Sequence, residues 1–285
     1  MKTSRYLILA LVLLLALGSA TTFARTDNET KTIQVDKADQ ISINCELGAG
    51  EFTIRPKDMK EAAIVDITYD SRYVDYVVDY SEKGGRGFLD MESDHRRSSH
   101  VDTEDNIWDI TLSTKYPLLL EMDFGACDAD FDLGGLPIRE LAIDIGAASG
   151  TIDFSSPNPE RLNEIDIDAG ATSLELRNFG NANFEYLNFE GGVGSFELDL
   201  RGQYKGESTV SVEVGLGSVE IVMPEGVAFR IETDGDHFLS SIDFHNSRSN
   251  EVDDNVYESD DFEDADTRII LELSAGLGSI DVYWK

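Results

Sequence analysis

The sequence predicts an all-β fold: a parallel β-solenoid, similar to a β-helix, with coils of about 22 residues and a glycine at each corner. Three observations support this prediction: a repeat centred on glycines, apolar columns at fixed distances from each glycine, and a shift of the apolar alternation at the glycine itself. The central spacings of the repeat are 21, 24, 22 and 23 residues. The glycines at the repeat centres are Gly48, Gly125, Gly146, Gly170, Gly192, Gly215 and Gly276.

Three columns around the glycine are wholly apolar. Five positions before it stand Ile43, Leu120, Leu141, Ile165, Leu187, Val210 and Leu271. Three positions before it stand Cys45, Met122, Ile143, Ile167, Phe189, Val212 and Leu273. Six positions after it stand Ile54, Phe131, Ile152, Leu176, Leu198, Ile221 and Val282. Since successive coils of a solenoid place like positions above like, these columns would form continuous apolar ladders in the core.

The apolar alternation changes phase at the glycine. Residues that face inward lie an odd number of positions before the glycine and an even number of positions after it. The two-residue period of a strand therefore slips by one residue at the glycine. One position after the glycine stand Ala49, Ala126, Ala147, Ala171, Val193, Leu216 and Leu277. Two positions after it only small residues occur, namely Gly50, Cys127, Ala148, Thr172, Gly194, Gly217 and Gly278. Each coil is therefore predicted as a strand, a tight glycine corner, a second strand and a looser turn.

The chain divides into three predicted parts. Residues 1–24 form a signal peptide, residues 25–124 a divergent β region that caps the solenoid, and residues 125–285 the solenoid repeats. The capping region contains β-rich pieces at residues 62–69, 73–80 and 107–114, around a polar loop at residues 95–106.

An acidic insert interrupts the repeats at about residues 236–267. Gly215 and Gly276 are 61 residues apart, which is more than one coil too many. Nine of the 17 residues from 251 to 267 are acidic and none is basic. Because such a segment has little to bury, it is predicted as a loop.

The first 24 residues have the features of a secretory signal peptide. Lys2 and Arg5 precede an apolar run that ends at Leu17, and small residues lead to the expected cleavage site after Ala24. A retained membrane anchor is the alternative, but the run is 12 residues long and a spanning helix needs about 20. The chain is therefore expected outside the cytoplasm, whether in the periplasm, secreted or at the cell surface.

The charge excludes one large class of partners. The chain has 56 Asp and Glu against 23 Lys and Arg, and its net charge is −33. Because nucleic-acid binding needs a basic face to neutralise phosphates, DNA and RNA are excluded as partners. With 41% hydrophobic residues the chain still has enough apolar side chains for a core.

Two segments resemble a known family. The run from Trp108 through Pro117 to Leu133 resembles the toast-rack family of bacterial envelope proteins. The segment from Val214 to Val227 resembles the related putative-adhesin and cell-wall-active antibiotics response domains. The resemblance covers about residues 41–285. It implies a β-solenoid on the extracytoplasmic side, a role in adhesion or envelope-stress signalling, and no catalytic residues. The chain differs from the membrane-bound stress regulators in its acidic insert and its lack of their spanning helices.

An acidic column offers a candidate metal site. It lies two positions before the glycine, consists of Glu46, Asp123, Asp144, Asp168, Glu190 and Glu213, and is broken by Ser274. In an in-register stack these carboxylates would follow one another at about 4.8 Å on an outer face. One interpretation is a solvated surface, since like charges at that distance repel only weakly in water. The other is a Ca²⁺ site, there or within residues 251–266, because Ca²⁺ prefers several carboxylate oxygens. No other cofactor is expected.

No catalytic residues are predicted. The sequence has no Gly-x-Ser-x-Gly motif, and its serines three positions after the glycine, Ser149, Ser173, Ser195, Ser218 and Ser279, form a hydroxyl row on a turn. His95, His100, His237 and His245 lie in polar segments without cysteines at zinc spacing. Cys45 and Cys127 belong to different columns, so a disulfide between them is not expected.

The sequence therefore favours a non-enzymatic interaction module of the cell envelope. Its partner would be an envelope protein, a glycan or a cell-wall component. Self-association is a further expectation, because the final coil ends at Lys285 and leaves the strand edge at residues 280–285 unpaired. The alternatives are a polysaccharide-active β-helix enzyme, which would use paired carboxylates for acid–base catalysis, and a calcium-stabilised structural surface protein.

Overall fold

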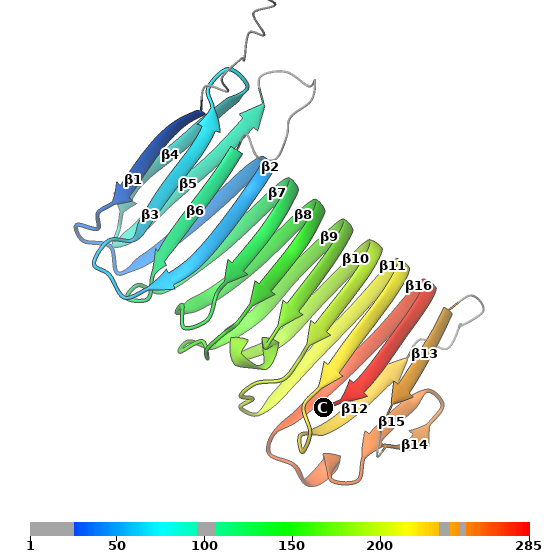
Figure 1. The fold of residues 1–285 in the computed structure, drawn as a ribbon. Coiled ribbons are helices and arrows are strands. Elements are labelled where there is room, and N and C mark those ends of the chain that lie inside the picture. The colour runs from blue at the N-terminus through cyan, green and yellow to red at the C-terminus, as the bar shows by residue number, and fades with distance from the viewer. Residues whose placement is uncertain (1–25, 96–105, 234–239, 246–248) are drawn as a thin grey trace, which may run out of the picture.

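Long, bent β-strands stack like steps along one axis and form a parallel β-solenoid (Figure 1). The computed structural model describes residues 26–95, 106–233, 240–245 and 249–285. The predicted all-β fold is confirmed: apart from the short 3-10 helices η2 (Phe179–Ala182) and η3 (Phe262–Asp264), the regular elements of these residues are strands. The expected signal peptide lies outside the described residues.

Each repeat glycine lies within one long strand of a parallel array. The array runs in the order β2 (Gln40–Lys57), β7 (Leu118–Asp132), β8 (Ile138–Asp153), β9 (Leu162–Arg177), β10 (Phe184–Asp199), β11 (Glu207–Met223) and β16 (Arg268–Trp284). Like positions pair in register across neighbouring strands, as Ile143 with Ile167 and Leu187 with Val210 show. The sequence columns therefore are the ladders of the sheet. The boundary expected at residue 125 falls inside β7.

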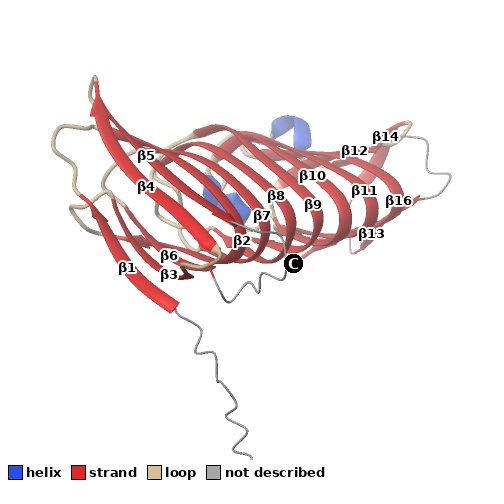
Figure 2. Ribbon diagram, turned by 90° about the horizontal axis from the view of Figure 1, so that it is seen from above, coloured by secondary structure: helices blue, strands red, loops and turns tan. Residues whose placement is uncertain are grey.

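Every strand of the array folds back on itself near its glycine. In Figure 1 the two halves of each strand run side by side in two layers, and Figure 2 shows the same flattened coils from above. Side chains of the two layers meet in the core: the Phe124 and Phe131 ring centroids are 5.0 Å apart, and those of Phe189 and Phe196 are 5.1 Å apart. In β7 the buried residues lie one, three, five and seven positions before Gly125 and two, four and six positions after it. The predicted phase slip is confirmed, and it leaves two successive outward positions, the glycine and the residue after it.

The bend requires glycine because neighbouring coils are in close contact there. A Cβ on Gly170 would lie 2.4 Å from the carbonyl oxygen of Gly146, and a Cβ on Gly146 would lie 2.6 Å from that of Gly125. From Gly125 onward, each bend glycine thus packs against the carbonyl oxygen of the bend glycine in the preceding coil. Since any side chain would push the coils apart, the same residue recurs in every coil.

Asparagine side chains close the side of the solenoid opposite the bends. The Asn158 side chain donates to the Ile138 carbonyl oxygen at 2.8 Å and accepts from the Ile138 amide at 3.2 Å. Asn183, one coil further, donates to the Glu160 carbonyl oxygen at 2.6 Å. These amides bind backbone groups at the start of β8 and in the turn that follows it, where strand pairing ends. They lie outside the repeat columns and were not among the sequence predictions.

The N-terminal end is closed by two short antiparallel extensions of the layers. One layer continues from β2 through β6 (Asn106–Ser113) and β3 (Ala63–Asp70) to β1 (Thr26–Ile33), and the other through β5 (Arg86–His95) to β4 (Val74–Lys83). These strands include the β-rich pieces expected in the cap. Tyr76 joins the layers, because its ring lies edge-on to Tyr69 at 5.0 Å and to Trp108 at 5.8 Å. Hydrogen bonds from Tyr76, Lys31 and Tyr69 lower the pKa of Glu29 to about 2.

The C-terminal end departs from the order of the sequence. β16, the last strand of the chain, lies between β11 on one side and both β12 (Ala228–Thr233) and β13 (Ser240–His245) on the other. β13 pairs with Gly278–Tyr283, so the expectation of a free edge at residues 280–285 is wrong. The physical reason is that two earlier segments are added outside the last strand. Among the described residues, β13 pairs with β16 alone, so the exposed edge of this layer belongs to β13.

The acidic insert is not simply a loop. β14 (Ser249–Asp253) and β15 (Val256–Ser259) form an antiparallel hairpin, and β15 pairs with β12. Phe262 of η3 anchors the segment, because its side chain is buried beneath the Arg230 guanidinium. The guanidinium carbon lies 4.4 Å from the centroid of the Phe262 ring. The prediction of a loop failed here, because a few apolar side chains are enough to fasten an acidic segment to a sheet edge.

Within the described residues, no helix has the length and apolar character needed to cross a membrane.

The requirement for glycine at the bend can be tested with two alanine substitutions that differ in how closely the new methyl group approaches the neighbouring coil. We expect Gly170→Ala to cost about 2 kcal/mol of stability, and so lower the melting temperature by about 4–8 °C, because the new methyl lies 2.4 Å from a backbone oxygen. Gly125→Ala should cost less, since its Cβ would lie 3.0 Å from the nearest oxygen. Thermal melting of the three proteins measures the order. Equal melting temperatures would show that the bend accommodates a side chain without strain.

Candidate functional site

The predicted acidic column forms a continuous row on the outer surface. Glu46 pairs with Asp123, Asp123 with Asp144, and the register continues in the same way to Glu213, which stands opposite Ser274. All members of this carboxylate row are exposed. The row consists of Glu46, Asp123, Asp144, Asp168, Glu190 and Glu213.

The pKa of one carboxyl in the row, that of Asp123, is perturbed. The pKa of the Asp123 carboxyl is raised, first by partial removal from water and then by the charges of Asp144 and Glu46 on the adjacent strands. The ionised form of Asp123 is thus less favourable in the folded protein than in the unfolded chain.

The geometry around the carboxylate row does not by itself form a metal site. Among the described residues, no group of three or more His, Cys, Asp or Glu side chains is placed to hold a metal ion. A flat row also presents its oxygens from one side, whereas Ca²⁺ takes six to eight oxygen ligands around it. Calcium binding by this row or by residues 251–266 stays a prediction.

A row of exposed apolar side chains runs beside the carboxylate row, and it was not among the sequence predictions. Val193, Leu216 and Leu277 follow one another in register and are 53%, 48% and 44% exposed. Ala171, Ala147, Ala126 and Ala49 continue this apolar row toward the N-terminal end. The phase slip was the signal that could have revealed it, because two successive outward positions leave the residue after each glycine facing solvent.

Serines and a second set of acids occupy the other flank of the apolar row. Ser195 and Ser218 lie in register two positions beyond Val193 and Leu216, with their hydroxyl oxygens 3.4 Å apart. Two positions further comes a second carboxylate row, which consists of Glu175, Glu197, Glu220 and Asp281. These serines and acids line a shallow hollow of about 280 Å³. The apolar row therefore lies between two acidic rows.

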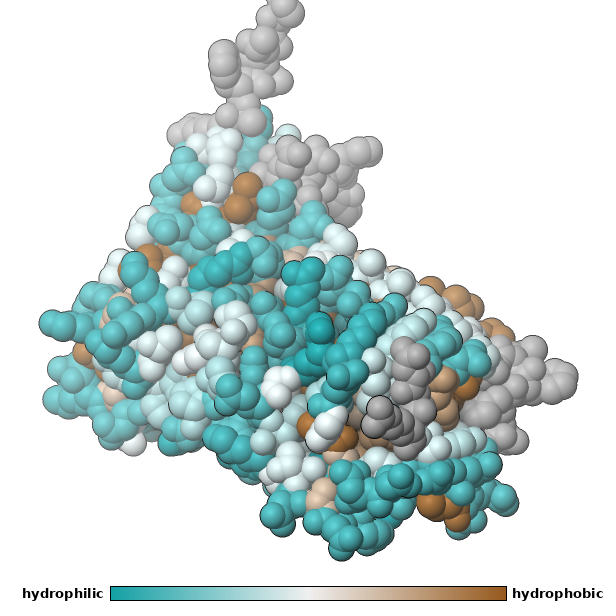
Figure 3. All heavy atoms as spheres, turned by 60° about the horizontal axis from the view of Figure 1, so that its bottom comes forward, coloured by the Kyte–Doolittle hydropathy of each residue, from teal (hydrophilic) through white to brown (hydrophobic). Residues whose placement is uncertain are grey.

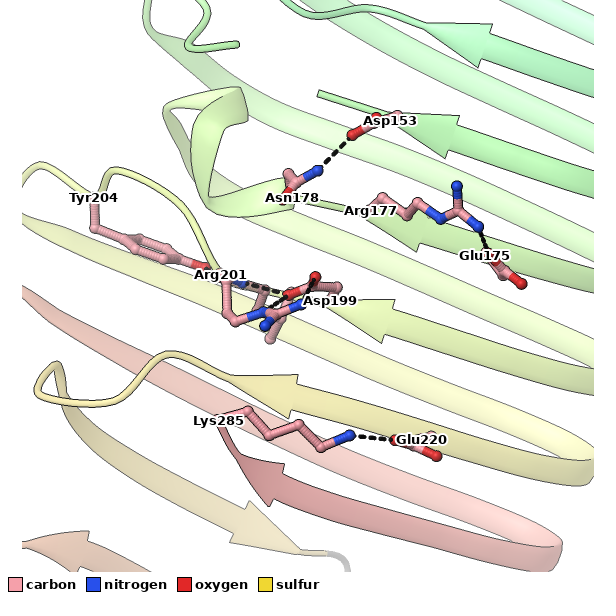
Figure 4. Close-up of polar contacts among 10 residues, drawn as sticks. Asp153, Glu175, Arg177, Asn178, Asp199, Arg201, Tyr204, Glu220 and Lys285 are labelled. Carbon is pink, nitrogen blue, oxygen red and sulfur yellow. Dashed lines mark hydrogen bonds and ion pairs between the residues drawn. The ribbon is translucent and has the colours of Figure 1, made fainter. Parts of the chain in front are cut away.

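Among the described residues, one arginine and one lysine reach the second carboxylate row. Figure 4 shows Arg177 pointing toward Glu175 on the same strand, and Lys285 reaching Glu220 with a distance of 3.2 Å from nitrogen to oxygen. The first carboxylate row has no such neighbour: within the described part of the chain, no Lys or Arg forms an ion pair with any of its members. The acidic surface on that flank is left uncompensated.

The histidines and serines form no catalytic set within the described residues. The His245 ring lies against the Tyr283 ring at 4.4 Å, and its Nε2 is 2.8 Å from a carboxylate oxygen of Asp281. The His95 side chain, His100 and His237 lie outside the described residues. In the serine row, Ser149 donates to the Asp128 carboxylate and Ser218 donates to Ser195, while the His245 ring is engaged by Asp281.

Both cysteines are buried free thiols. Cys45 faces the core in β2, and Cys127 lies at the inner side of the bend in β7. Burial raises the pKa of each thiol to about 12, and the Asp128 charge adds to the rise at Cys127. Neither residue therefore has the thiolate character that nucleophiles and metal ligands need.

Two of the larger hollows on the described structure lie away from the apolar row. One, of about 630 Å³, lies at the C-terminal end between the β11–β12 turn, the β15–η3 segment and Trp284. The other, of about 700 Å³, lies on the outer face of the first strand halves near Arg139 and Arg161. Arg139 is engaged by Glu160 at 3.1 Å, and Arg161 donates to the carbonyl oxygens of Lys205 and Glu207. Both guanidinium groups thus serve contacts between coils.

The chain belongs to the toast-rack family. The family model described as the N-terminal domain of toast_rack, DUF2154, matches residues 22–177, more than half of the chain. A second model, for the C-terminal region of the cell wall-active antibiotics response protein LiaF, matches residues 170–282. The matches include the segments at residues 108–133 and 214–227 that carry the sequence resemblance, which is thereby confirmed. No curated protein matches the sequence.

Solved structures with a similar arrangement come from several bacteria. A structure described as a putative cell adhesion protein from Clostridium sporogenes has a TM-score of 0.49 and 18% identity, and the match covers 92% of this chain and 100% of that one. A putative adhesin from Bacteroides fragilis has a TM-score of 0.36 and 10% identity over 90% and 97% of the two chains. A putative adhesin from Parabacteroides distasonis has a TM-score of 0.36 and 11% identity over 91% and 98%.

The raised pKa of Asp123 gives a pH-dependent prediction. Because the folded pKa exceeds the unfolded value, ionised Asp123 lowers stability at neutral pH, and this cost disappears as pH falls through the raised pKa toward about 4. We expect Asp123→Asn to raise the melting temperature at pH 7 by about 1–2 °C, since solvent screening limits the effect to about 0.5 kcal/mol. The gain should vanish near pH 4.

Glu213→Gln is the matched control for that measurement. Glu213 belongs to the same row but has an acidic neighbour on one side only, Glu190, with Ser274 on the other. Its amide variant should therefore gain less than Asp123→Asn. An Asp123→Asn protein that melts at the same temperature as the parent at pH 7 would contradict the assigned cost of ionising Asp123 in the folded protein.

The state of the cysteines can be read with a thiol reagent. In the folded protein Cys45 and Cys127 should resist dithionitrobenzoate, because both are buried and protonated at neutral pH. In guanidinium both of the two cysteines should react. Absence of reaction in guanidinium without reductant, followed by reaction after reduction, would reveal a disulfide instead.

Proposed function

We propose that this protein is an exported, non-enzymatic binding module of the bacterial cell envelope. The observation that supports this function best is the outer surface beside the bends, where side chains of one kind recur in register over several successive coils. Such a surface offers a long and repetitive contact area. Adhesion and envelope-stress sensing are two uses for it, and both depend on holding a partner.

Several features support binding over catalysis. The one histidine ring of the described residues, His245, pairs with Asp281, and the carboxylates are spread along rows on an open surface. A polysaccharide-active enzyme would need two carboxylates facing each other across a substrate, with separations that depend on the mechanism. The surface in Figure 3 is mostly hydrophilic, and its hydrophobic atoms occur in small groups. The names of the matching families and structures are those of adhesins and of a cell wall response protein.

An envelope location is part of the same proposal. The predicted signal peptide at residues 1–24 and the membership of the toast-rack family support it. Fractionation of cells that express the full chain tests the location directly. Recovery of the protein in the cytoplasm alone would reject it.

Crosslinking in the cell tests the binding function. A photo-reactive amino acid placed at Ser195 or Ser218, beside the apolar row, should capture an envelope component after illumination. The same amino acid at Lys83, exposed at the tip of the β4–β5 turn, is the control and should capture less. Equal yields at the three positions, or no adduct at any, would overturn the proposal. Release of reducing ends from acidic polysaccharides by the purified protein would overturn its non-enzymatic part.

A further inference from the structure

The apolar row is an unusual feature for a protein of this charge. Val193, Leu216 and Leu277 stand next to one another on three adjacent strands, and each exposes about half of its surface. Neighbouring strands are about 4.8 Å apart, so the three side chains form a ridge roughly 10 Å long. Adjacent exposed branched aliphatic side chains mark an interaction site more often than single ones do.

The surroundings of the row select the charge of its partner. Asp168, Glu190 and Glu213 follow one flank, without a basic residue paired to them in the described structure. Glu197 and Glu220 follow the other flank beyond the serines, on the second layer of the solenoid, and Lys285 already pairs with Glu220 at 3.2 Å. A partner seated on the apolar row at the bend would therefore meet one carboxylate row on each layer, the first of them without an ion pair to Lys or Arg in the described structure. Only a partner with basic flanks would be complementary to this surface.

This electrostatic pattern argues against other occupants. A second copy of the chain placed face to face would set carboxylate row against carboxylate row, and like charges would oppose that contact. A membrane surface rich in anionic lipids would be repelled in the same way. Addition of a strand is not available at the row, because the backbone groups beside it already pair within the sheet on both sides of β10 and β11.

The spacing of the row fits an α-helix that lies along the solenoid axis. Apolar residues at positions i, i+3, i+4 and i+7 of a helix recur about every 5 Å along its axis, since each residue rises 1.5 Å. The side chains of the row recur about every 4.8 Å. Over three coils the two periods stay within roughly 1 Å of one another, and the basic residues on the sides of such a helix would reach the flanking acids.

We infer that the apolar row with its two acidic flanks binds a basic amphipathic helix of a protein partner. Val193, Leu216 and Leu277 receive the apolar stripe of the helix, and the flanking carboxylates receive its Lys and Arg side chains. The inference rests on the proposed binding function and specifies its partner. The alanines that continue the row toward the N-terminal end of the solenoid leave room for larger side chains of the helix there.

A designed peptide with the inferred chemistry tests this directly. The probe is a helix of Lys and Leu, about 18 residues or five turns long, with leucines at i, i+3, i+4 and i+7. A peptide of the same composition in scrambled order has the same charge but no apolar stripe. A third peptide keeps the stripe and replaces Lys by Glu. The binding of each to the full chain is measured by fluorescence anisotropy at physiological salt.

The striped basic peptide should bind at least about tenfold more tightly than the scrambled one, and the acidic peptide should not bind. The double variant Leu216→Ser/Leu277→Ser should lose at least about tenfold in affinity for the striped peptide. Val77→Ser removes an exposed apolar side chain from β4 in the N-terminal cap and should leave the affinity unchanged. Thermal melting verifies that these surface variants fold.

Two results would overturn the inference: equal affinity of the striped and scrambled peptides, or unchanged affinity of the double leucine variant. Either would show that binding depends on charge alone or occurs elsewhere. Failure of the proposed function is distinguishable, because it appears as absent or indiscriminate crosslinking in the cell. If peptide binding depends on Leu216 and Leu277 while the cell yields no adduct, the site stands and the envelope function falls.

Discussion

The contact between each bend glycine and the carbonyl of the preceding coil determines the rest of this structure. Because the Cα of one coil rests on the backbone oxygen of the previous one, the coils stack at full contact and the long strands pair in register on both sides of the bend. That register produces the apolar ladders of the core and, equally, the carboxylate, serine and apolar rows outside. A shift by one residue in any coil would exchange its inner and outer side chains.

The bend also explains why the outer surface carries an apolar row at all. An uninterrupted strand alternates strictly between the two faces of its sheet. The glycine and the residue after it both face outward, so the second of them lies outside the alternation. In the N-terminal coils alanine occupies this position, whereas Val193, Leu216 and Leu277 occupy it near the C-terminal end. The core requires none of these side chains to be large.

Much of the fold could be predicted from the sequence because the repeat places its information locally. The apolar columns at Ile143 or Leu187 and the phase slip at each glycine lie within one coil, and the stacking of coils then follows from their likeness. The exposed carboxylate row followed from the same columns. The C-terminal arrangement could not be predicted in this way, because β16 pairs with β11 across the intervening segment and leaves β12 and β13 outside it. Which of two segments inserts into a sheet depends on contacts between coils, and a single repeat does not encode them.

In this molecule the buried core provides stability, and the acidic rows and the apolar row on the surface provide recognition. The core is supplied by ladders of buried aliphatic and aromatic side chains, whereas like charges stand in register on the surface. Solvent weakens the repulsion between those charges while the surface is free. When a partner with basic flanks covers the row, the same carboxylates lose water but gain opposite charges. A row that is mildly unfavourable in the free protein thereby becomes a source of selectivity in the complex, because a partner without basic flanks would leave these charges covered and unpaired.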